Sequence, residues 1–136
     1  MPDCPRLQSL LPLPLPANPM ERTVLVMLRR MAIHGLRDAR ASQLALTTFG
    51  ARFDQVLALS RCLLHETATA SKSTIRIATC CTPRMTRDEA LMMDVILHGD
   101  KEALSAVTDN DMPARAYSAA LCLHNALEDI SPKVAR

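Results

Sequence analysis

Aromatic residues are almost missing from this chain of 136 residues, which has no Trp, two Phe and one Tyr. Glycine is scarce as well, with three residues in total. Strands favour aromatic and β-branched side chains, and tight hairpin turns favour glycine, so both shortages argue against a sheet-rich fold. Because 49% of the residues are nonetheless hydrophobic, the core must consist of Leu, Ala, Val, Ile and Met. We predict an all-α protein.

Sequence motifs of the common enzyme classes are missing too. The chain contains no G-x-S-x-G, HExxH, Walker or G-x-G-x-x-G pattern. Pairs of Cys and His could be drawn from five cysteines and four histidines in many ways, so no single pair indicates catalysis. We therefore expect a protein that is not an enzyme and that binds no cofactor.

Signals for membrane insertion and secretion are weak in this sequence. No window approaches about 18 uninterrupted apolar residues, so we predict no membrane-spanning helix. The apolar run within residues 1–16 is interrupted by Pro12, Pro14 and Pro16, which makes it a poor secretion signal. None of the five cysteines forms a CxxC pattern. We expect a cytoplasmic protein with reduced thiols.

The N-terminal residues 1–18 differ in composition from the rest of the chain. Leu and Pro alternate in LLPLPLPANP, which favours polyproline II geometry and forbids a helix. This segment is either a flexible tail or an extended strap whose leucines cover the helical core. We predict two parts, an extended Pro/Leu-rich tail over residues 1–18 and a single helical domain over residues 19–136.

Helix boundaries are well marked in the second part. Asn18 is a good N-cap before Pro19, and Gly35 and Gly99 suit the residues that follow a helix. Gly50 is either a break or a bend between two helical patterns. The predicted helices cover residues 19–34, 38–49, 52–69, 87–98 and 101–107, with a last helix from Pro113 that Pro132 closes. An orthogonal or up-and-down bundle of four to six helices accommodates them.

Residues 78–91 (ATCCTPRMTRDEAL) contain the sharpest helix start in the sequence. Thr86 and Glu89 have the spacing of a capping box, in which each side chain bonds to the backbone N–H of the other residue. Pro83 favours extended geometry just before this start. Upstream, Ile75 and Ile77 alternate with more polar residues, which is typical of a short strand or an extended connector. We predict an extended segment, a turn and then a helix.

Cys80 and Cys81 in this stretch are the candidate reactive thiols. The neighbouring Arg76, Arg84 and Arg87 could favour a thiolate, which is the reactive and metal-binding form of cysteine. The opposing interpretation is that both cysteines are small, buried hydrophobic side chains, and it is the more common case.

A metal site would need further ligands. Cys62 and His65 lie one helical turn apart and outside the apolar face of their helix, so they are weak candidates. Cys122 and His124 lie two residues apart and point to different sides of a helix. Four ligands with a chelating pair are usual for zinc, so we favour unrelated side chains.

Charge is distributed unevenly although the net charge is only +2. Residues 1–87 contain 12 Lys and Arg against 5 Asp and Glu, whereas residues 88–136 contain 4 against 9. Residues 43–57 loosely resemble a helix-turn-helix, but Asp54 and Gln55 stand where base-reading residues would gather. We favour an ordinary helical hairpin with solvated faces. Arg29 and Arg30 lie off the apolar stripe of their helix. The weak candidates for nucleic-acid contacts are Arg29, Arg30, Arg37, Arg40 and Arg52.

Three segments carry a resemblance to a known family. They are HGLRDA (34–39), TFGARF (48–53) and ATCCTPRMTRDE (78–89), of which the last is the most specific. Together they resemble a family of small helical proteins of unknown function from alphaproteobacteria, over most of residues 20–98. The resemblance implies a small cytosolic helical protein. It implies no activity, cofactor or catalytic residue.

Three functional hypotheses follow from these patterns. The first is a non-enzymatic helical protein that binds another protein, as a homodimer or a small regulator, since eight Met and an Ala/Leu-rich seam suit adaptable helix-in-groove contacts. A plain core is the stronger explanation of those methionines. The second is a thiol or metal sensor centred on Cys80 and Cys81. The third is a weak DNA-binding regulator that uses the Arg-rich first half.

Overall fold

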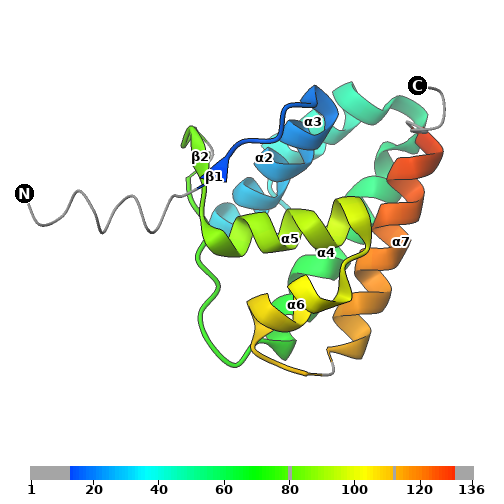
Figure 1. The fold of residues 1–136 in the computed structure, drawn as a ribbon. Coiled ribbons are helices and arrows are strands. Elements are labelled where there is room, and N and C mark those ends of the chain that lie inside the picture. The colour runs from blue at the N-terminus through cyan, green and yellow to red at the C-terminus, as the bar shows by residue number, and fades with distance from the viewer. Residues whose placement is uncertain (1–12, 80, 112, 131–136) are drawn as a thin grey trace, which may run out of the picture.

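The computed structural model describes residues 13–79, 81–111 and 113–130 of the chain. These residues form six α-helices, one short 3₁₀ helix and a two-stranded sheet, so the prediction of a bundle of four to six helices is confirmed (Figure 1). The helices are α2 (Pro19–His34), α3 (Ala39–Phe49), η1 (Gly50–Arg52), α4 (Phe53–Ala70), α5 (Arg87–His98), α6 (Lys101–Thr108) and α7 (Ala114–Ile130).

Local capping sets most of the helix ends where they were expected. The Asn18 side chain accepts hydrogen bonds from Met20 N–H and Glu21 N–H at the start of α2. The capping box of Thr86 and Glu89 is complete, and α5 runs over the predicted residues. Gly50 adopts a φ of 57° and ends α3, so it is a break rather than a bend. Gly99 ends α5 with a φ of 67°, a left-handed conformation that glycine adopts without strain.

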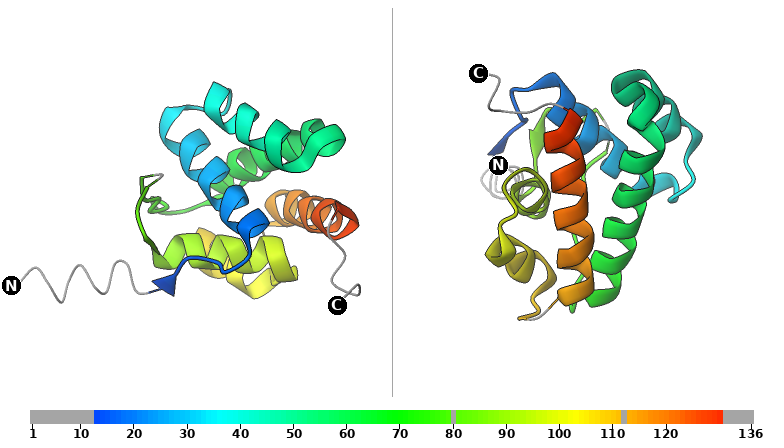
Figure 2. Two further views of the ribbon diagram at one scale, coloured as in Figure 1. Left: turned by 90° about the horizontal axis from the view of Figure 1, so that it is seen from above. Right: turned by 90° about the vertical axis from the view of Figure 1, so that its right-hand side faces the viewer.

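The core lies between the helices and consists of aliphatic side chains and methionine. Helices α4 and α7 pack along each other over most of their lengths, and α5 lies beside α6 and α7 (Figure 2). Four methionines of the helices are almost fully buried: Met27, Met31, Met92 and Met93. With one Tyr and two Phe in the whole chain, these flexible side chains fill space that aromatic rings occupy in other cores.

A small sheet joins the N-terminal segment to the domain. Strand β1 (Leu13–Pro14) pairs antiparallel with β2 (Arg84–Met85), so that Leu13 faces Met85. Leu15 is partly buried against the core. The extended-strap alternative therefore describes residues 13–15. The rest of the predicted tail, residues 1–12, lies outside the described residues, and the boundary at residue 18 stays a prediction.

A connector of residues 71–83 links α4 to β2 (Figure 1). Its residues 74–79 form no strand, so of the two alternatives the extended connector is the correct one. Ile75 and Ile77 are half-buried, whereas Thr74 and Arg76 are exposed, which keeps the alternation of an extended chain. Among the described residues, no helix combines the length and the hydropathy that a membrane crossing requires.

Candidate functional site

A buried ion pair anchors the connector to the bundle. The guanidinium of Arg29 on α2 and the carboxylate of Glu89 on α5 form two parallel hydrogen bonds, Nε–Oε2 at 2.7 Å and Nη2–Oε1 at 2.9 Å. Both side chains are only 1% exposed. Bidentate pairs of this kind are the strongest hydrogen-bonded ion pairs in proteins.

The remaining hydrogen-bonding capacity of this pair goes to the backbone around the connector. Arg29 donates to the carbonyls of Thr82 at 2.9 Å and Arg84 at 2.8 Å. Glu89 accepts from Ala78 N–H at 3.0 Å and Thr86 N–H at 2.9 Å. Two buried charges thereby hold both the irregular connector and the start of strand β2.

The position of Arg29 corrects the sequence prediction. It was expected outside the apolar face of its helix, as a candidate nucleic-acid contact, but it is 1% exposed and its charge is compensated by Glu89. The capping box accounts for Glu89 in the sequence, yet the same carboxylate also holds Arg29, a residue 60 positions away. A buried arginine is stable here because its donors have acceptors.

The two edges of the connector at residues 75–78 have different partners. Arg76 N–H donates to Asp88 at 2.8 Å and Ala78 N–H donates to Glu89, so these alternate amides face α5. Thr86 Oγ1 also donates to the carbonyl of Arg76 at 2.7 Å. Within the described residues, neither the N–H nor the C=O of Ile75 and Ile77 has a hydrogen-bond partner. The edge that faces away from α5 therefore has no hydrogen-bond partner among the described residues.

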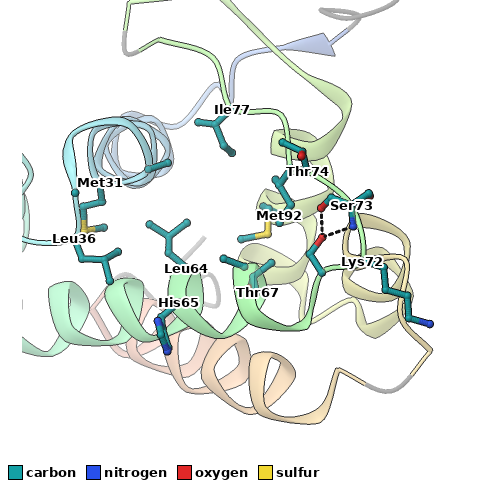
Figure 3. Close-up of a pocket in the computed structure, with 15 residues that line it drawn as sticks. Met31, Leu36, Leu64, His65, Thr67, Lys72, Ser73, Thr74, Ile77 and Met92 are labelled. Carbon is teal, nitrogen blue, oxygen red and sulfur yellow. Dashed lines mark hydrogen bonds between the residues drawn. The ribbon is translucent and has the colours of Figure 1, made fainter.

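Beside this connector lies an apolar groove of about 680 Å³, which we call the α2–α4 groove. Figure 3 shows side chains from α2, α4, α5 and the connector gathered around it. Its volume is within the range of roughly 300–1,000 Å³ that is typical of ligand sites. The apolar side chains around it are those of Met31, Ala32, Leu36, Leu64, Ala68, Ile75, Ile77 and Met92.

Thr67 is an unusual polar residue in the lining of this groove. It is 1% exposed, and its Oγ1 has no hydrogen-bond partner in the described structure. Sequence reasoning missed Thr67, although a signal existed: Val56, Ser60, Leu63 and Thr67 continue one face of α4 at spacings of four, three and four residues. Ser60, on the same face, is the second buried hydroxyl without a partner.

Charged groups stand only at the margin of the groove. Its lining includes Lys72 and His65 but no Asp or Glu. Both side chains point away from the centre in Figure 3, so the interior is apolar and the edge is basic. Arg76 is exposed on the connector and is not among the residues that line the groove.

One of the two predicted thiols, Cys81, lies in the described part of the connector. Cys81 is exposed, close to a turn in which Thr82 N–H donates to the carbonyl of Thr79 at 3.1 Å. Cys80 lies outside the described residues. Cys81 lines a second cavity, of about 450 Å³, together with Arg30 and Arg40. These arginines come from α2 and α3, and the sequence argument had considered only the arginines that neighbour the cysteines in the chain.

The weak metal candidates are exposed on α4. Cys62 and His65 both face solvent, one helical turn apart. No group of three or more Cys, His, Asp and Glu side chains with metal-binding geometry occurs within residues 13–79, 81–111 and 113–130. His124 Nδ1 lies 2.9 Å from the carbonyl of Ile96, which ties that side chain to α5.

The other candidate arginines are spread over several elements. Arg30 forms a two-pronged ion pair with Asp38, with both N–O distances at 3.1 Å. These hydrogen bonds from Arg30 hold the pKa of the Asp38 carboxyl below its ordinary value, and a hydrogen bond from Ala41 N–H lowers it further. Arg52 donates to Gln55 within the hairpin of α3 and α4. Arg37 and Arg40 are exposed.

Comparisons with known proteins identify a family and nothing closer. Neither the curated proteins nor the solved structures contain a significant match to the chain. One family model matches residues 6–135, which is nearly the whole chain and extends well past the stretch that the sequence motifs had suggested. The chain belongs to the family described as Family of unknown function (DUF6628).

Proposed function

We propose that this is a non-enzymatic protein that acts by binding another protein, and that the α2–α4 groove is the contact site. The observation that carries the proposal is the groove itself, an apolar hollow of about 680 Å³ assembled from three helices and the connector. Apolar hollows of this size on small proteins are typically sites of recognition.

The chemistry of the lining favours a protein partner over a reacting substrate. No Asp or Glu lies in the lining, and the two basic side chains point outward (Figure 3). The groove therefore offers no carboxylate for general acid–base catalysis, and His65 and Lys72 lie outside its centre. Met31 and Met92 supply flexible apolar surface, which adapts to the side chains of different partners.

A peptide library displayed on phage tests this proposal without knowledge of the natural partner. Selection on the wild-type protein is expected to enrich peptides that bind wild type and fail to bind Ala68→Glu, which adds a charge at the groove. Ala58→Glu is the matched control, because Ala58 is also exposed on α4 but does not line the groove. If the protein is a monomer, failure to enrich any peptide, or peptides that bind both variants equally, would refute the groove as a protein-binding site.

A second copy of the chain is one possible partner. Sedimentation of the wild type and the Ala68→Glu variant distinguishes this case from a foreign partner. A dimer that becomes a monomer in Ala68→Glu, but not in Ala58→Glu, identifies the homodimer. A monomer in all three samples leaves the peptide-binding experiment to identify a foreign partner.

A reactive thiol at Cys81 is the second candidate function. It is favoured by one observation, namely that Arg30 and Arg40 line the same cavity as this exposed cysteine. Positive charge near a thiol favours its reactive thiolate form. Such a thiol would act as an oxidation sensor rather than as a catalyst.

Alkylation rates measured by mass spectrometry test this second candidate. In a Cys80→Ser background, iodoacetamide is expected to label Cys81 faster than Cys62 and Cys122, which are also exposed and serve as internal controls. Arg40→Met is expected to slow labelling of Cys81 alone. Equal rates at the three cysteines would argue against a thiol function.

A further inference from the structure

We propose that the partner of the α2–α4 groove binds as an extended peptide that adds a strand along residues 74–78 of the connector. This inference rests on the proposed function and specifies the conformation of the bound segment. It replaces the helix-in-groove contact that the methionine content suggested, because the groove is bounded by an extended chain with unpaired backbone groups.

The hydrogen bonds of the connector leave one edge available for pairing. In a strand, the N–H and C=O of successive residues point alternately to opposite edges. The groups of Arg76 and the N–H of Ala78 are directed to α5, where Asp88, Glu89 and Thr86 bind them. The N–H and C=O of Ile75 and Ile77 therefore point to the opposite edge, and no described residue pairs with them. Unpaired edges of this kind are templates for another strand.

The groove lies on the side of the connector to which side chains of an added strand would point. Neighbouring strands present their side chains on shared faces, at a strand spacing of about 4.8 Å. Ile75 and Ile77 both line the groove. An added strand would direct every second side chain to the same side, and those side chains would enter the groove. Backbone pairing and apolar burial thus act together at one location.

The connector is held in place before any partner arrives. The Arg29–Glu89 pair, Asp88 and Thr86 fix its α5 edge, and Lys72 N–H donates to the carbonyl of Thr108 at 2.9 Å near its start. Binding therefore requires ordering of the peptide but not of the protein, which favours affinity.

Charge at the groove margin narrows the class of peptide. Lys72 lines the groove at its margin and carries an ammonium group. No carboxylate lines the groove to offset it. The expected peptide has apolar residues at alternate positions and an acidic residue next to them, at the end that lies near Lys72.

Amide exchange measured by NMR, with a peptide from the phage selection as the probe, tests the pairing directly. In the free protein we expect slow exchange at Arg76 and Ala78 and fast exchange at Ile75 and Ile77. The bound peptide is expected to slow exchange at Ile75 and Ile77 by about tenfold or more, the effect of one new hydrogen bond in each case. Unchanged exchange at these two amides in the complex would overturn the added strand while the proposed function stands.

N-methylation of the peptide backbone tests the same pairing through the amide groups of the peptide. Single N-methyl groups are expected to reduce affinity about tenfold at every second position and to have little effect between them. Lys72→Glu is expected to weaken an acidic peptide about fivefold, whereas Arg37→Glu, exposed between α2 and α3, is expected to leave affinity unchanged. Losses without a period of two would contradict the extended conformation. If the protein is a monomer and no peptide binds at all, both the inference and the proposed function are wrong.

Discussion

The two edges of the connector, which lies outside regular secondary structure, differ in how their backbone groups are hydrogen-bonded. On the α5 edge, Arg29, Glu89, Asp88 and Thr86 satisfy backbone groups with short hydrogen bonds, and two of these side chains are 1% exposed. On the other edge, Ile75 and Ile77 have no backbone partner within the described structure, and the adjoining groove contains an unpartnered Thr67 hydroxyl.

This difference teaches how a small helical protein can fix an extended segment through one edge alone. Buried polar groups are ordinarily paired, because an unpaired one costs about 1–3 kcal/mol. The backbone hydrogen bonds of the connector are concentrated on its α5 edge and fix its position. The backbone groups of Ile75 and Ile77 on the other edge have no partner among the described residues. The predictions below begin with the paired edge, where the effects are largest.

Removal of Arg29 is expected to produce the largest effect. Arg29→Met leaves the Glu89 charge buried without its partner, and breaking a buried ion pair in this way costs roughly 3–5 kcal/mol of unfolding free energy. Urea denaturation followed by circular dichroism measures the loss. Arg37→Met, at an exposed position of the loop after α2, is the control and should change stability by less than about 0.5 kcal/mol.

A double variant separates the ion pair from simple packing. Arg29→Met with Glu89→Leu removes both buried charges, so its stability should exceed that of Arg29→Met alone. If the double variant is less stable than Arg29→Met by the full cost of Glu89→Leu, the two residues are not coupled. The α5 edge of the connector would then be held in place by contacts other than this ion pair.

Thr86 is expected to have the next largest effect on the paired edge. Thr86→Ala removes the hydroxyl that caps α5 at Glu89 N–H and that donates to the carbonyl of Arg76. Loss of a cap costs about 1 kcal/mol, and the second hydrogen bond adds to it. Thr86→Ser keeps the hydroxyl and should retain most of the stability, as measured by thermal denaturation. Equal losses in both variants would point to the methyl group instead.

Thr67 and Thr108 offer a matched pair with opposite expected signs. Thr67→Val removes a buried hydroxyl that has no partner and should raise stability by about 1 kcal/mol. Thr108→Val removes a buried hydroxyl that donates to the carbonyl of Leu104 at 2.8 Å and should lower it by about the same amount. Chemical denaturation of both variants decides. Destabilisation by Thr67→Val would mean that this hydroxyl has a hydrogen-bond partner. The groove side of the connector would then differ less from the α5 side.

Local features were predictable from the sequence because their determinants lie within one helical turn. Thr86, Glu89 and Gly99 mark both ends of α5, and the predicted helix agrees with the observed bounds. Asn18 marks the start of α2 in the same way. The all-α class followed from composition alone, since too few glycines and aromatic residues were present to build a larger sheet.

The ion pair and the groove were not predictable, for a physical reason. Arg29 and Glu89 are 60 positions apart, and an arginine on a helix is ordinarily assigned to solvent unless its partner is known. The groove depends on where the connector lies, and the hydrogen bonds of that buried pair set its position. Thr67 showed a periodic signal on α4, but periodicity predicts burial without showing which neighbour leaves the hydroxyl unpaired.

The smallest effect is expected at the neighbouring arginine, Arg30, whose ion pair with Asp38 anchors no connector. The pKa of Asp38 is lowered, chiefly by its hydrogen bonds to Arg30. A carboxyl whose pKa is lower in the folded state stabilises the protein above its unfolded pKa of about 3.9, and this contribution is lost as the pH falls through the lowered value. An NMR titration should therefore find the midpoint of Asp38 below 3.8, the ordinary value, and Arg30→Met should raise it. Asp38→Asn keeps an acceptor for Ala41 N–H but loses the charge, so its stability deficit should vanish in strong acid. A deficit that persists at every pH would show that Asp38 contributes through the cap of α3 and not through its charge. In that case, of the two neighbouring ion pairs, Arg29–Glu89 would stabilise the protein through its charges and Arg30–Asp38 would not.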